Sequence, residues 1–283
     1  MLNGKSITCK AYAKINLFLN VFNKTKDNLH NLKSLVCFID LYDEIKISES
    51  KKFSIEINGP FKNSIKKKNT IQKTFIIFSK FSGLKNNYKI ILNKKIPVAA
   101  GLGGGSADSA AVLEGLNILN KKKINKKDLF KLAMTVGSDV PACLYNKNVF
   151  FSGYGDTLFK APRIPQFSIL LINPRKELST KKVFDIYIKK KLIKKNNFAY
   201  KNFFSWILEQ NNDLQKYAEK FVPEIKKMVN FLSSSKNCYL SRMTGSGPTV
   251  FGLFKKKIDA KKANLLLRKK HPKWWSGVYT IKS

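Results

Sequence analysis

The most restrictive feature of this sequence is a glycine-rich loop that separates two segments of different periodicity. Four of the five residues in 101–105 are glycine, and Pro97 stands shortly before them. Upstream, residues 88–93 have the short apolar composition of a strand. Downstream, apolar residues recur at helical spacing, at Val112, Leu113, Leu116 and Leu119. The sequence therefore predicts a strand, a glycine loop and a helix in succession.

The loop itself predicts an anion-binding site. Glycines allow the backbone to approach a ligand with its N–H groups exposed, and the following helix adds the positive end of its dipole. A phosphate chain is the expected ligand. No Gly-Lys-Ser/Thr follows the loop, and Ser106 takes the place of the last glycine of a Gly-x-Gly-x-x-Gly pattern. The loop therefore argues against a Walker-type NTPase and against dinucleotide binding, and the flanking helix argues against a simple linker.

Two polar residues near the N-terminus stand out as candidate site residues. Residues 12–22 alternate with the period of a strand that has one buried face, so Lys14 and Asn16 point to the same side. Lys14 is a candidate for stabilising charge, although an edge-strand lysine would look the same. Further apolar runs predict a helix and more strands, at 69–80, 35–41, 44–48 and 53–58. We therefore expect a strand-rich, antiparallel first third.

Asp139 is the candidate proton acceptor. It lies in Gly-Ser-Asp-Val-Pro, directly after a predicted helix at 126–136, and Pro141 is expected to prevent that helix from continuing. The carboxylate would then be displayed from a bend, as a general base requires. The alternative is an acid that only flanks a helix. Ser106 and Asp108 pose a similar choice, since they fit N-terminal capping and also the binding of Mg²⁺ on a nucleotide.

The second half of the chain is expected to form another lobe. Strands are predicted at 168–172, 239–243 and 249–254, and helices at 203–208, 223–232 and 259–269. Between the last two strands, Gly245, Ser246 and Gly247 alone indicate only a flexible turn. We place the lobe boundary near residue 160, which gives lobes of residues 1–160 and 161–283.

The high positive charge of the chain would fit a nucleic-acid-binding protein, but its low arginine content argues against that function. There are 54 Lys and Arg residues against 18 Asp and Glu, a formal net charge of +36, but only four are arginine. Base-reading surfaces favour the arginine fork, whereas lysine is a hydrated point charge. We interpret most of the excess as compositional drift towards residues with AT-rich codons. A selected polyanion-binding surface is the alternative.

Cysteine and hydropathy patterns indicate a soluble, cytoplasmic protein. The four cysteines are scattered without a Cys-x-x-Cys pair, and only His30 and His271 supply imidazole, so no zinc or iron–sulfur site is expected. Scattered cysteines fit a reducing compartment. No stretch approaches the ~20 apolar residues of a membrane span, and residues 1–12 lack the apolar region of a signal peptide.

Three segments, in this order, resemble the three motifs of the GHMP kinases. They are the lysine-bearing strand with Ala13-Lys14-Ile15-Asn16-Leu17, the glycine-rich segment from Pro97 to Ala107, and Thr244-Gly245-Ser246-Gly247-Pro248. Together these motifs are specific, and the resemblance covers essentially the whole chain. It implies a two-lobed α+β fold, with an N-terminal lobe similar to ribosomal protein S5 domain 2 and a C-terminal α/β sandwich lobe.

The resemblance also implies an activity. Details such as Gly137-Ser138-Asp139-Val140-Pro141 are most similar to members that use ATP and Mg²⁺ to phosphorylate the 2-hydroxyl of 4-diphosphocytidyl-2-C-methyl-D-erythritol, in the non-mevalonate (MEP) route to isoprenoid precursors. The partner is then this small molecule, with no specific nucleic acid and no membrane, and the protein is a monomer or a homodimer. The alternatives are a kinase of the homoserine or mevalonate type and, less in keeping with the motifs, a basic RNA-binding protein.

The roles of the site residues follow from the same resemblance. Asp139 would be the catalytic base and Lys14 its partner, and Ser106 and Asp108 would hold the magnesium of ATP. The residues expected to bind ATP are Asn69, near the adenosine, and Pro97, Gly101, Leu102, Gly103, Gly104, Gly105, Ser106 and Ala107. The residues expected to contact the acceptor are Asn16, His30 at the cytosine, Phe184 as a stacking ring, Gly245 and Ser246.

One departure from the family concerns the cytosine. Members carry a Gly-Tyr-His run whose tyrosine packs on the base, where this chain has Asn28-Leu29-His30, and a second common aromatic is Val36 here. An aromatic face contributes ~1–3 kcal/mol per stacked base. We therefore expect either weaker packing at Leu29 or another ring in its place.

Overall fold

The computed structural model describes residues 5–24, 30–65, 69–120, 123–153, 157–161, 163–187 and 202–282. The chain forms two compact units. The first unit consists of Met1–Lys14, Leu41–Val98 and Gly103–Lys147, and the second of Ile15–Asp40, Ala99–Leu102 and Asn148–Ser283. Two strands and the glycine loop therefore belong in part to each unit. The division of the sequence at residue 160 stays a prediction.

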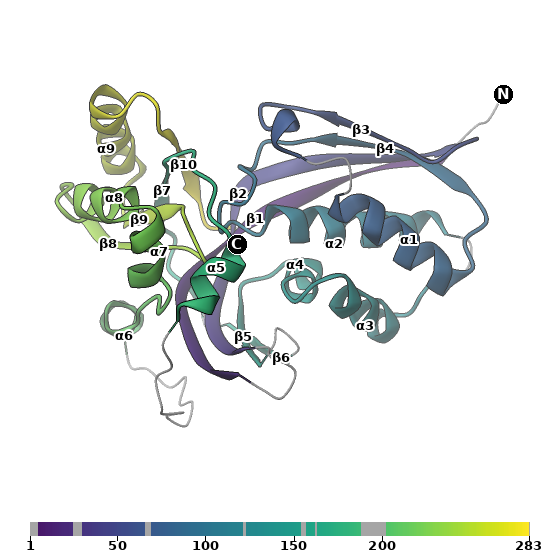
Figure 1. The fold of residues 1–283 in the computed structure, drawn as a ribbon, viewed down its shortest axis with the longest axis horizontal. Helices are drawn as coiled ribbons and strands as arrows, with labels where there is room; N and C mark the ends of the chain where they lie inside the picture. The colour runs from purple at the N-terminus through teal and green to yellow at the C-terminus, as the bar shows by residue number, and fades with distance from the viewer. Residues whose placement is uncertain are drawn as a thin grey trace. The chain divides into compact units, whose positions relative to one another are not determined.

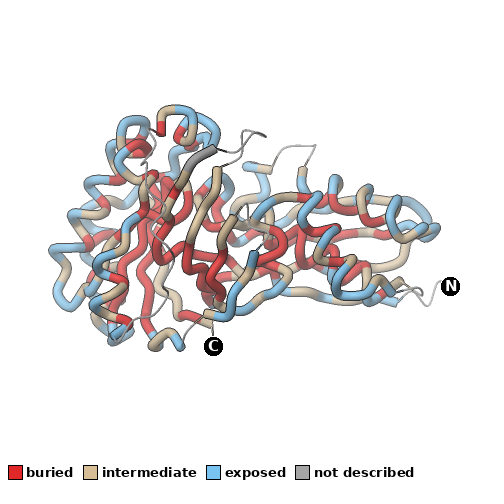
Figure 2. The backbone as a smooth tube through the Cα atoms, turned by 90° about the horizontal axis from the view of Figure 1, so that it is seen from below, coloured by how far each residue is buried: buried red, intermediate tan, exposed pale blue. Residues whose placement is uncertain are grey.

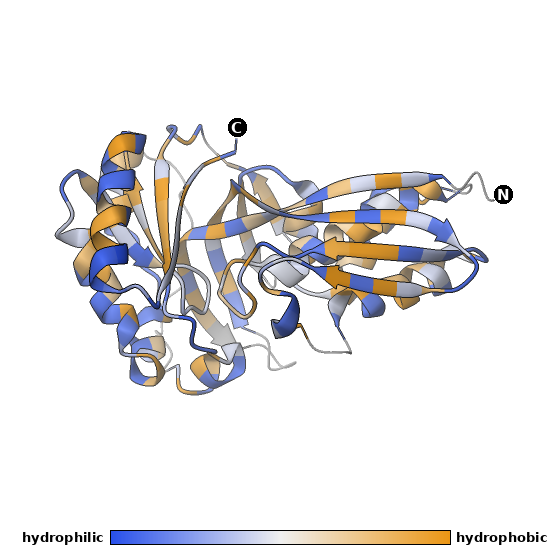
Figure 3. Ribbon diagram, turned by 90° about the horizontal axis from the view of Figure 1, so that it is seen from above, coloured by the Kyte–Doolittle hydropathy of each residue, from blue (hydrophilic) through white to orange (hydrophobic). Residues whose placement is uncertain are grey.

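The sheet of the first unit is built from strands β1 (Ser6–Lys24), β2 (His30–Ser50), β3 (Ser54–Asn58) and β4 (Asn87–Asn93). β2 pairs with β1 and, in antiparallel direction, with β4, whereas β3 lies parallel to β4. The antiparallel prediction is wrong for this last pair, because helix α1 (Thr70–Ser82) connects β3 to β4 and a helical crossover permits parallel pairing. Apolar and polar residues alternate along these strands (Figure 3).

Helices α1 and α2 (Gly104–Leu119) lie along one face of this sheet (Figure 1). Helices α3 (Lys126–Val136) and α4 (Val140–Tyr145) pack against them, and a short 3-10 helix, η1, spans Lys62–Ser64. The helices predicted after the glycine loop, at 69–80 and at 126–136 are confirmed. α1 begins where Asn69 caps it, accepting a hydrogen bond from the Gln72 N–H at 3.1 Å, and ends at Gly83.

In the second unit, β5 (Val149–Gly153) pairs antiparallel with β2 and with β6 (Thr157–Lys160). A separate antiparallel sheet has the order β10-β7-β9-β8. In that order its strands are Trp275–Thr280, Ser168–Asn173, Val250–Phe254 and Cys238–Met243. The helices of this unit are α5 (Thr180–Asp185), α6 (Phe203–Glu209), α7 (Gln215–Phe221), α8 (Glu224–Ser233) and α9 (Lys257–Lys270).

The core of the second unit surrounds β7 and β9, which are buried along their whole length (Figure 2). Helices α8 and α9 pack against these strands and contribute Ile225, Met228 and Leu267 to the core. The strands predicted at 168–172, 239–243 and 249–254 are confirmed, as are the helices at 203–208, 223–232 and 259–269. In the described ranges, no helix combines the length and the apolar composition needed to cross a bilayer.

Arg242 on β8 is 5% exposed and joins three parts of the second unit through their backbone carbonyls. Its Nη1 donates to the Leu17 carbonyl at 2.6 Å, and its Nη2 donates to the carbonyls of Ile207, at 3.3 Å, and Gln210. Burial lowers the pKa of Arg242 to about 10, so the side chain stays charged at neutral pH. The rigid guanidinium fork reaches several acceptors at once, which a lysine ammonium cannot do in the same geometry.

Replacing Arg242 with methionine should destabilise the protein by about 3 kcal/mol, because buried carbonyls lose their donors. Arg242→Lys should recover only part of that loss. Urea denaturation followed by circular dichroism gives the free energy of unfolding. The matched control is Arg163→Met at an exposed position, which should change stability by less than about 0.5 kcal/mol. Equal destabilisation by Arg242→Met and Arg163→Met would contradict the structural role of Arg242.

Candidate active site

In the first unit the structure brings Lys14 and Asp139 together. The Lys14 Nζ lies 3.1 Å from the Asp139 Oδ2, with the lysine side chain 7% exposed and the aspartate 35% exposed. Every side chain from residue 13 to residue 19 of β1 is buried, so this part of the strand has no exposed face and the Lys14 side chain is shielded from solvent. The pair therefore joins a sheltered cation to a carboxylate that a ligand can reach.

Asp139 lies in the turn that follows α3, where the sequence predicted a break, and this turn leads directly into α4. It is the residue before α4, and Pro141 lies in the first turn of that helix. Proline is tolerated there because the first N–H groups of a helix have no intrahelical acceptor. The Gly137 backbone accepts from the Val140 N–H at 3.1 Å, which closes the turn between α3 and α4. The carboxylate is thus displayed at a fixed position.

The start of α2 lies directly over two lysine side chains. Gly103, the N-cap residue, has φ 66°, and a β-carbon there would come within 2.7 Å of the Lys14 Cγ. A β-carbon on Gly104 would lie 3.0 Å from the Lys94 Nζ. The first N–H groups of a helix have no intrahelical partners and carry the positive end of the dipole. This turn can therefore bind an anion with its amides while two cations lie beneath it.

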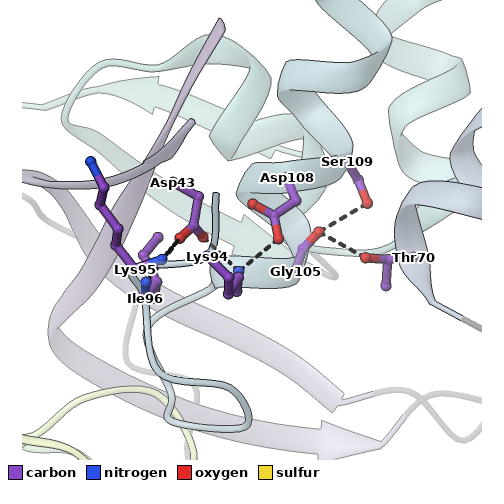
Figure 4. Close-up of polar contacts among 8 residues, drawn as sticks. All are labelled: Asp43, Thr70, Lys94, Lys95, Ile96, Gly105, Asp108 and Ser109. Carbon is purple, nitrogen blue, oxygen red and sulfur yellow. Dashed lines mark hydrogen bonds and ion pairs between the residues drawn. The ribbon is translucent and has the colours of Figure 1, made fainter. Parts of the chain in front are cut away.

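Lys94 bridges two buried carboxylates (Figure 4). Its Nζ lies 2.5 Å from the Asp43 Oδ2 and 2.6 Å from the Asp108 Oδ2, and all three side chains are at most 4% exposed. Burial raises the pKa of Asp108, with Lys94 opposing the shift and Asp43 adding to it. Burial alone would lower the pKa of Lys94, but Asp108 and Asp43 outweigh it and the pKa is raised. Sequence reasoning missed Asp43 and Lys94 and gave Asp108 a different role.

The other residues predicted to bind a nucleotide fall into two groups. Pro97, Leu102 and Ala107 are buried. Gly105 is exposed and Ser106 is half-buried, at the outer side of the turn. The Gly105 carbonyl accepts from the Ser109 hydroxyl at 2.9 Å and from the Thr70 hydroxyl at 3.3 Å (Figure 4). Thr70 directly follows Asn69, so the capped start of α1 is fastened to the glycine loop.

In the second unit, Thr244 fixes the first part of the glycine loop. Its buried hydroxyl accepts from the Asn16 N–H at 2.9 Å and donates to the Gly101 carbonyl at 3.2 Å. Gly101 has φ 73°, and a β-carbon there would collide with the Thr244 carbonyl oxygen. The turn that seemed only flexible in sequence is therefore packed against the loop. Asn212, which sequence reasoning missed, supports it by donating to the Gly245 carbonyl at 2.8 Å.

The predicted acceptor residues of the second unit include two that touch. The rings of His30 and Phe184 have centroids 4.9 Å apart, and Tyr187 and His30 form a T-shaped pair with centroids 6.2 Å apart. The Tyr187 hydroxyl donates to the Val21 carbonyl at 2.7 Å, which fixes that ring. Val36 is buried on β2, and Leu29 lies outside the described residues. Tyr187 is thus an aromatic neighbour of His30 that sequence reasoning missed.

Two further acceptor candidates are held by polar contacts. The Asn16 amide donates to the Ser34 hydroxyl at 2.7 Å, and that hydroxyl donates to the Phe18 carbonyl at 2.6 Å. The Ser246 and Thr180 hydroxyls lie 2.7 Å apart at an exposed position. Asn16 is therefore oriented by β2, whereas Ser246 stays accessible beside a second hydroxyl.

Comparison with known proteins assigns the chain to a protein family. The model of the GHMP kinases N terminal domain matches residues 69–147, and that of the GHMP kinases C terminal region matches residues 199–272. The chain belongs to the GHMP kinase family, and the predicted two-lobed α+β fold is confirmed. It is 38% identical over 272 residues to the 4-diphosphocytidyl-2-C-methyl-D-erythritol kinase of Ehrlichia canis (strain Jake), covering 94% of this chain and 95% of that protein.

Solved structures show the same relationship. A 4-(cytidine 5'-diphospho)-2C-methyl-D-erythritol kinase has a TM-score of 0.76 and 27% identity, covering 96% of this chain and 99% of its own. The homoserine kinase from Cytophaga hutchinsonii ATCC 33406 has a TM-score of 0.71 and 20% identity, covering 98% of this chain and 94% of its own. This second similarity shows a shared fold alone.

Gly103→Ala should lower kcat by about 100-fold, because a displacement of Lys14 misplaces the Lys14–Asp139 pair. The matched control is Gly83→Ala. Gly83 has nearly the same backbone conformation, with φ 64°, but a β-carbon there meets nothing within 4 Å. It reports the strain of the left-handed conformation alone. Steady-state kinetics of both variants measure the difference, and equal kcat values would contradict the requirement for space above Lys14.

Proposed function

We propose that this protein transfers the γ-phosphoryl group of ATP to the 2-hydroxyl of 4-diphosphocytidyl-2-C-methyl-D-erythritol, a step of the non-mevalonate (MEP) route to isoprenoid precursors. The observation that carries the proposal is the paired Lys14 and Asp139 beneath a glycine loop, in a chain 38% identical over nearly its whole length to a kinase named for this substrate. The homoserine and mevalonate alternatives lack such support, because the similar homoserine and mevalonate kinases are 20% and 14% identical to this chain and show a shared fold alone.

Asp139 acts as the general base in this proposal. Its carboxylate, which is 35% exposed, accepts the proton of the acceptor hydroxyl as the hydroxyl oxygen attacks the γ-phosphorus and the bond from that phosphorus to the oxygen of the leaving ADP breaks. Lys14 keeps the carboxylate in place and stabilises the negative charge that develops on the transferred group. A base within reach of one acceptor hydroxyl contributes typically 10²–10⁴-fold to the rate.

The glycine loop binds the phosphates of ATP in this proposal. The amides of Gly104, Gly105 and Ser106 lie at the start of α2, where helix geometry leaves N–H groups for an anion. Bound Mg²⁺ would neutralise charge on the β- and γ-phosphates. The half-buried Ser106 hydroxyl fits that role, whereas the Asp108 carboxylate is bonded to Lys94 and 3% exposed. We therefore assign the metal to the phosphates and Ser106.

The second unit binds the acceptor in this proposal. His30 and Phe184 form an aromatic pair suited to a cytosine, with Asn16, Gly245 and Ser246 as polar contacts for the rest of the molecule. We place the reaction in the cytoplasm, since the cysteines at positions 9, 37, 143 and 238 are free thiols. The protein acts as a monomer or a homodimer and needs no nucleic acid.

An ADP-release assay with three acceptors side by side tests the function. The purified protein, ATP and Mg²⁺ are combined with 4-diphosphocytidyl-2-C-methyl-D-erythritol, homoserine or mevalonate. Turnover is expected with the cytidyl substrate alone. Turnover with homoserine or mevalonate and not with the cytidyl substrate would overturn the assignment.

Asp139→Asn should lower kcat by about 10²–10⁴-fold, because the amide cannot accept the proton. ATP affinity, measured by isothermal titration calorimetry, should not weaken. The control is Glu56→Gln, which disrupts an exposed ion pair with Lys89 of similar length, 2.9 Å, and should leave kcat unchanged. An Asp139→Asn protein that keeps more than about a tenth of the wild-type kcat is incompatible with Asp139 as the base.

A further inference from the structure

Lys94 is a second cation beneath the glycine loop, and the catalytic pair makes no use of it. Its side chain is 3% exposed, yet it belongs to the polar segment between β4 and the loop. A buried ammonium is costly unless carboxylates surround it, and here Asp43 and Asp108 do so. Burying three charged groups costs free energy. Their position under a phosphate-binding turn therefore indicates a functional role in addition to packing.

The Lys94 cluster (Asp43, Lys94 and Asp108) fastens both sides of the loop. On the upstream side, Asp43 Oδ1 accepts hydrogen bonds from the Lys95 and Ile96 N–H groups, which lead into the loop. On the downstream side, Asp108 lies in the second turn of α2. The Lys94 ammonium links these two carboxylates, so one cation holds the segment before the loop to the helix after it (Figure 4).

The charges of the cluster also face the phosphate site. Two carboxylates and one ammonium leave one formal negative charge. Without the ammonium, one of the two buried carboxyls takes up a proton, because Lys94 opposes the rise in the pKa of Asp108, so one negative charge remains and no cation offsets it. The Lys94 Nζ lies directly under Gly104, where a β-carbon would be 3.0 Å from it. Asp108 Oδ1 is buried and has no hydrogen-bond partner among the described residues, so Lys94 is the cation that offsets this carboxylate. Uncompensated charge in a low-dielectric interior acts strongly over short distances.

We propose that Lys94 is a positioning residue for ATP, which supports the phosphate-binding turn from beneath by neutralising the carboxylates that fasten its two sides. Without the ammonium, the link between the segment before the loop and α2 is lost, and the cluster keeps a negative charge near the triphosphate that no cation offsets. Both effects weaken ATP binding and leave the acceptor residues of the second unit untouched. This proposal rests on the proposed function, because it takes ATP to be the ligand of the loop.

The variant Lys94→Met tests the proposal, because it should change the KM for ATP and leave the KM for the cytidyl substrate nearly unchanged. The KM for ATP should rise about tenfold or more, while the KM for the cytidyl substrate should stay within about twofold. The matched control is Lys89→Met, which removes an exposed lysine of β4 from its pair with Glu56 and should change neither KM. A folded Lys94→Met protein whose KM for ATP stays within twofold of the wild type would overturn the proposal.

The variant Lys94→Arg separates the charge role from simple packing. The guanidinium keeps a cation between Asp43 and Asp108, so the KM for ATP should stay within about threefold of the wild-type value. A folded Lys94→Arg protein as impaired as Lys94→Met would overturn the proposal. Failure of both variants to fold, judged by circular dichroism and thermal unfolding, would also overturn it, because Lys94 would then serve the fold and not ATP binding.

The wild-type assay keeps the two conclusions distinguishable. If the wild-type protein shows no ATP turnover with any acceptor, the proposed function fails whatever Lys94 does. If the wild type is active and Lys94→Met keeps its ATP affinity, the role of Lys94 fails and the proposed function stands. Calorimetric titration of ATP and Mg²⁺ into each variant provides the same comparison without turnover.

Discussion

The burial of lysine ammonium groups beneath the glycine loop is the constraint on which the candidate site depends. Removing a charge from water costs several kcal/mol in practice unless close partners replace the solvent. Lys14 and Lys94 are 7% and 3% exposed, and each meets this requirement with carboxylates. Lys14 thereby ties β1 to the start of α4, and Lys94 ties β2 and the end of β4 to α2. The same requirement sets the position of Asp139 and the shape of the turn at Gly103.

This constraint also explains why the large positive charge of the chain says so little about its chemistry. An exposed pair such as Lys89 and Glu56 contributes about 0–1 kcal/mol, because water screens it and both side chains lose freedom. Among the 54 basic residues, the structural effect of a cation is set by its burial, as Lys14, Lys94 and Arg242 show. Arg242 satisfies the requirement differently, since its guanidinium binds backbone carbonyls where the lysines bind carboxylates. Charge and function are connected here through these few buried positions.

Local periodicity predicted the strand, loop and helix around residues 101–105 and the helix at 126–136, because each depends on residues close in sequence. The start of α4 was missed, since Pro141 was interpreted as a helix stop although proline also fits a first turn. The Lys94 cluster was beyond such reasoning. Asp43 is 51 residues and Asp108 is 14 residues from Lys94, and nothing local distinguishes this lysine from the many others. Contacts of this kind follow from topology, here from β4 ending beside β2 and leading into α2.

The ring contacts of the second unit restrict how a cytosine can be held within the proposed function. Stacking a base between His30 and Phe184 would require their planes to lie about 7 Å apart, two van der Waals separations of about 3.5 Å each. Their centroids are 4.9 Å apart, so insertion would force the rings to separate. Tyr187 restricts the movement of His30, because the two rings lie in a T-shaped arrangement with centroids 6.2 Å apart and the Tyr187 hydroxyl donates to the Val21 carbonyl. A base that uses the hydrogen-bonding edge of His30 and one face of Phe184 requires no such separation. Hydrogen bonding by His30 would then carry more of the cytosine recognition than stacking does.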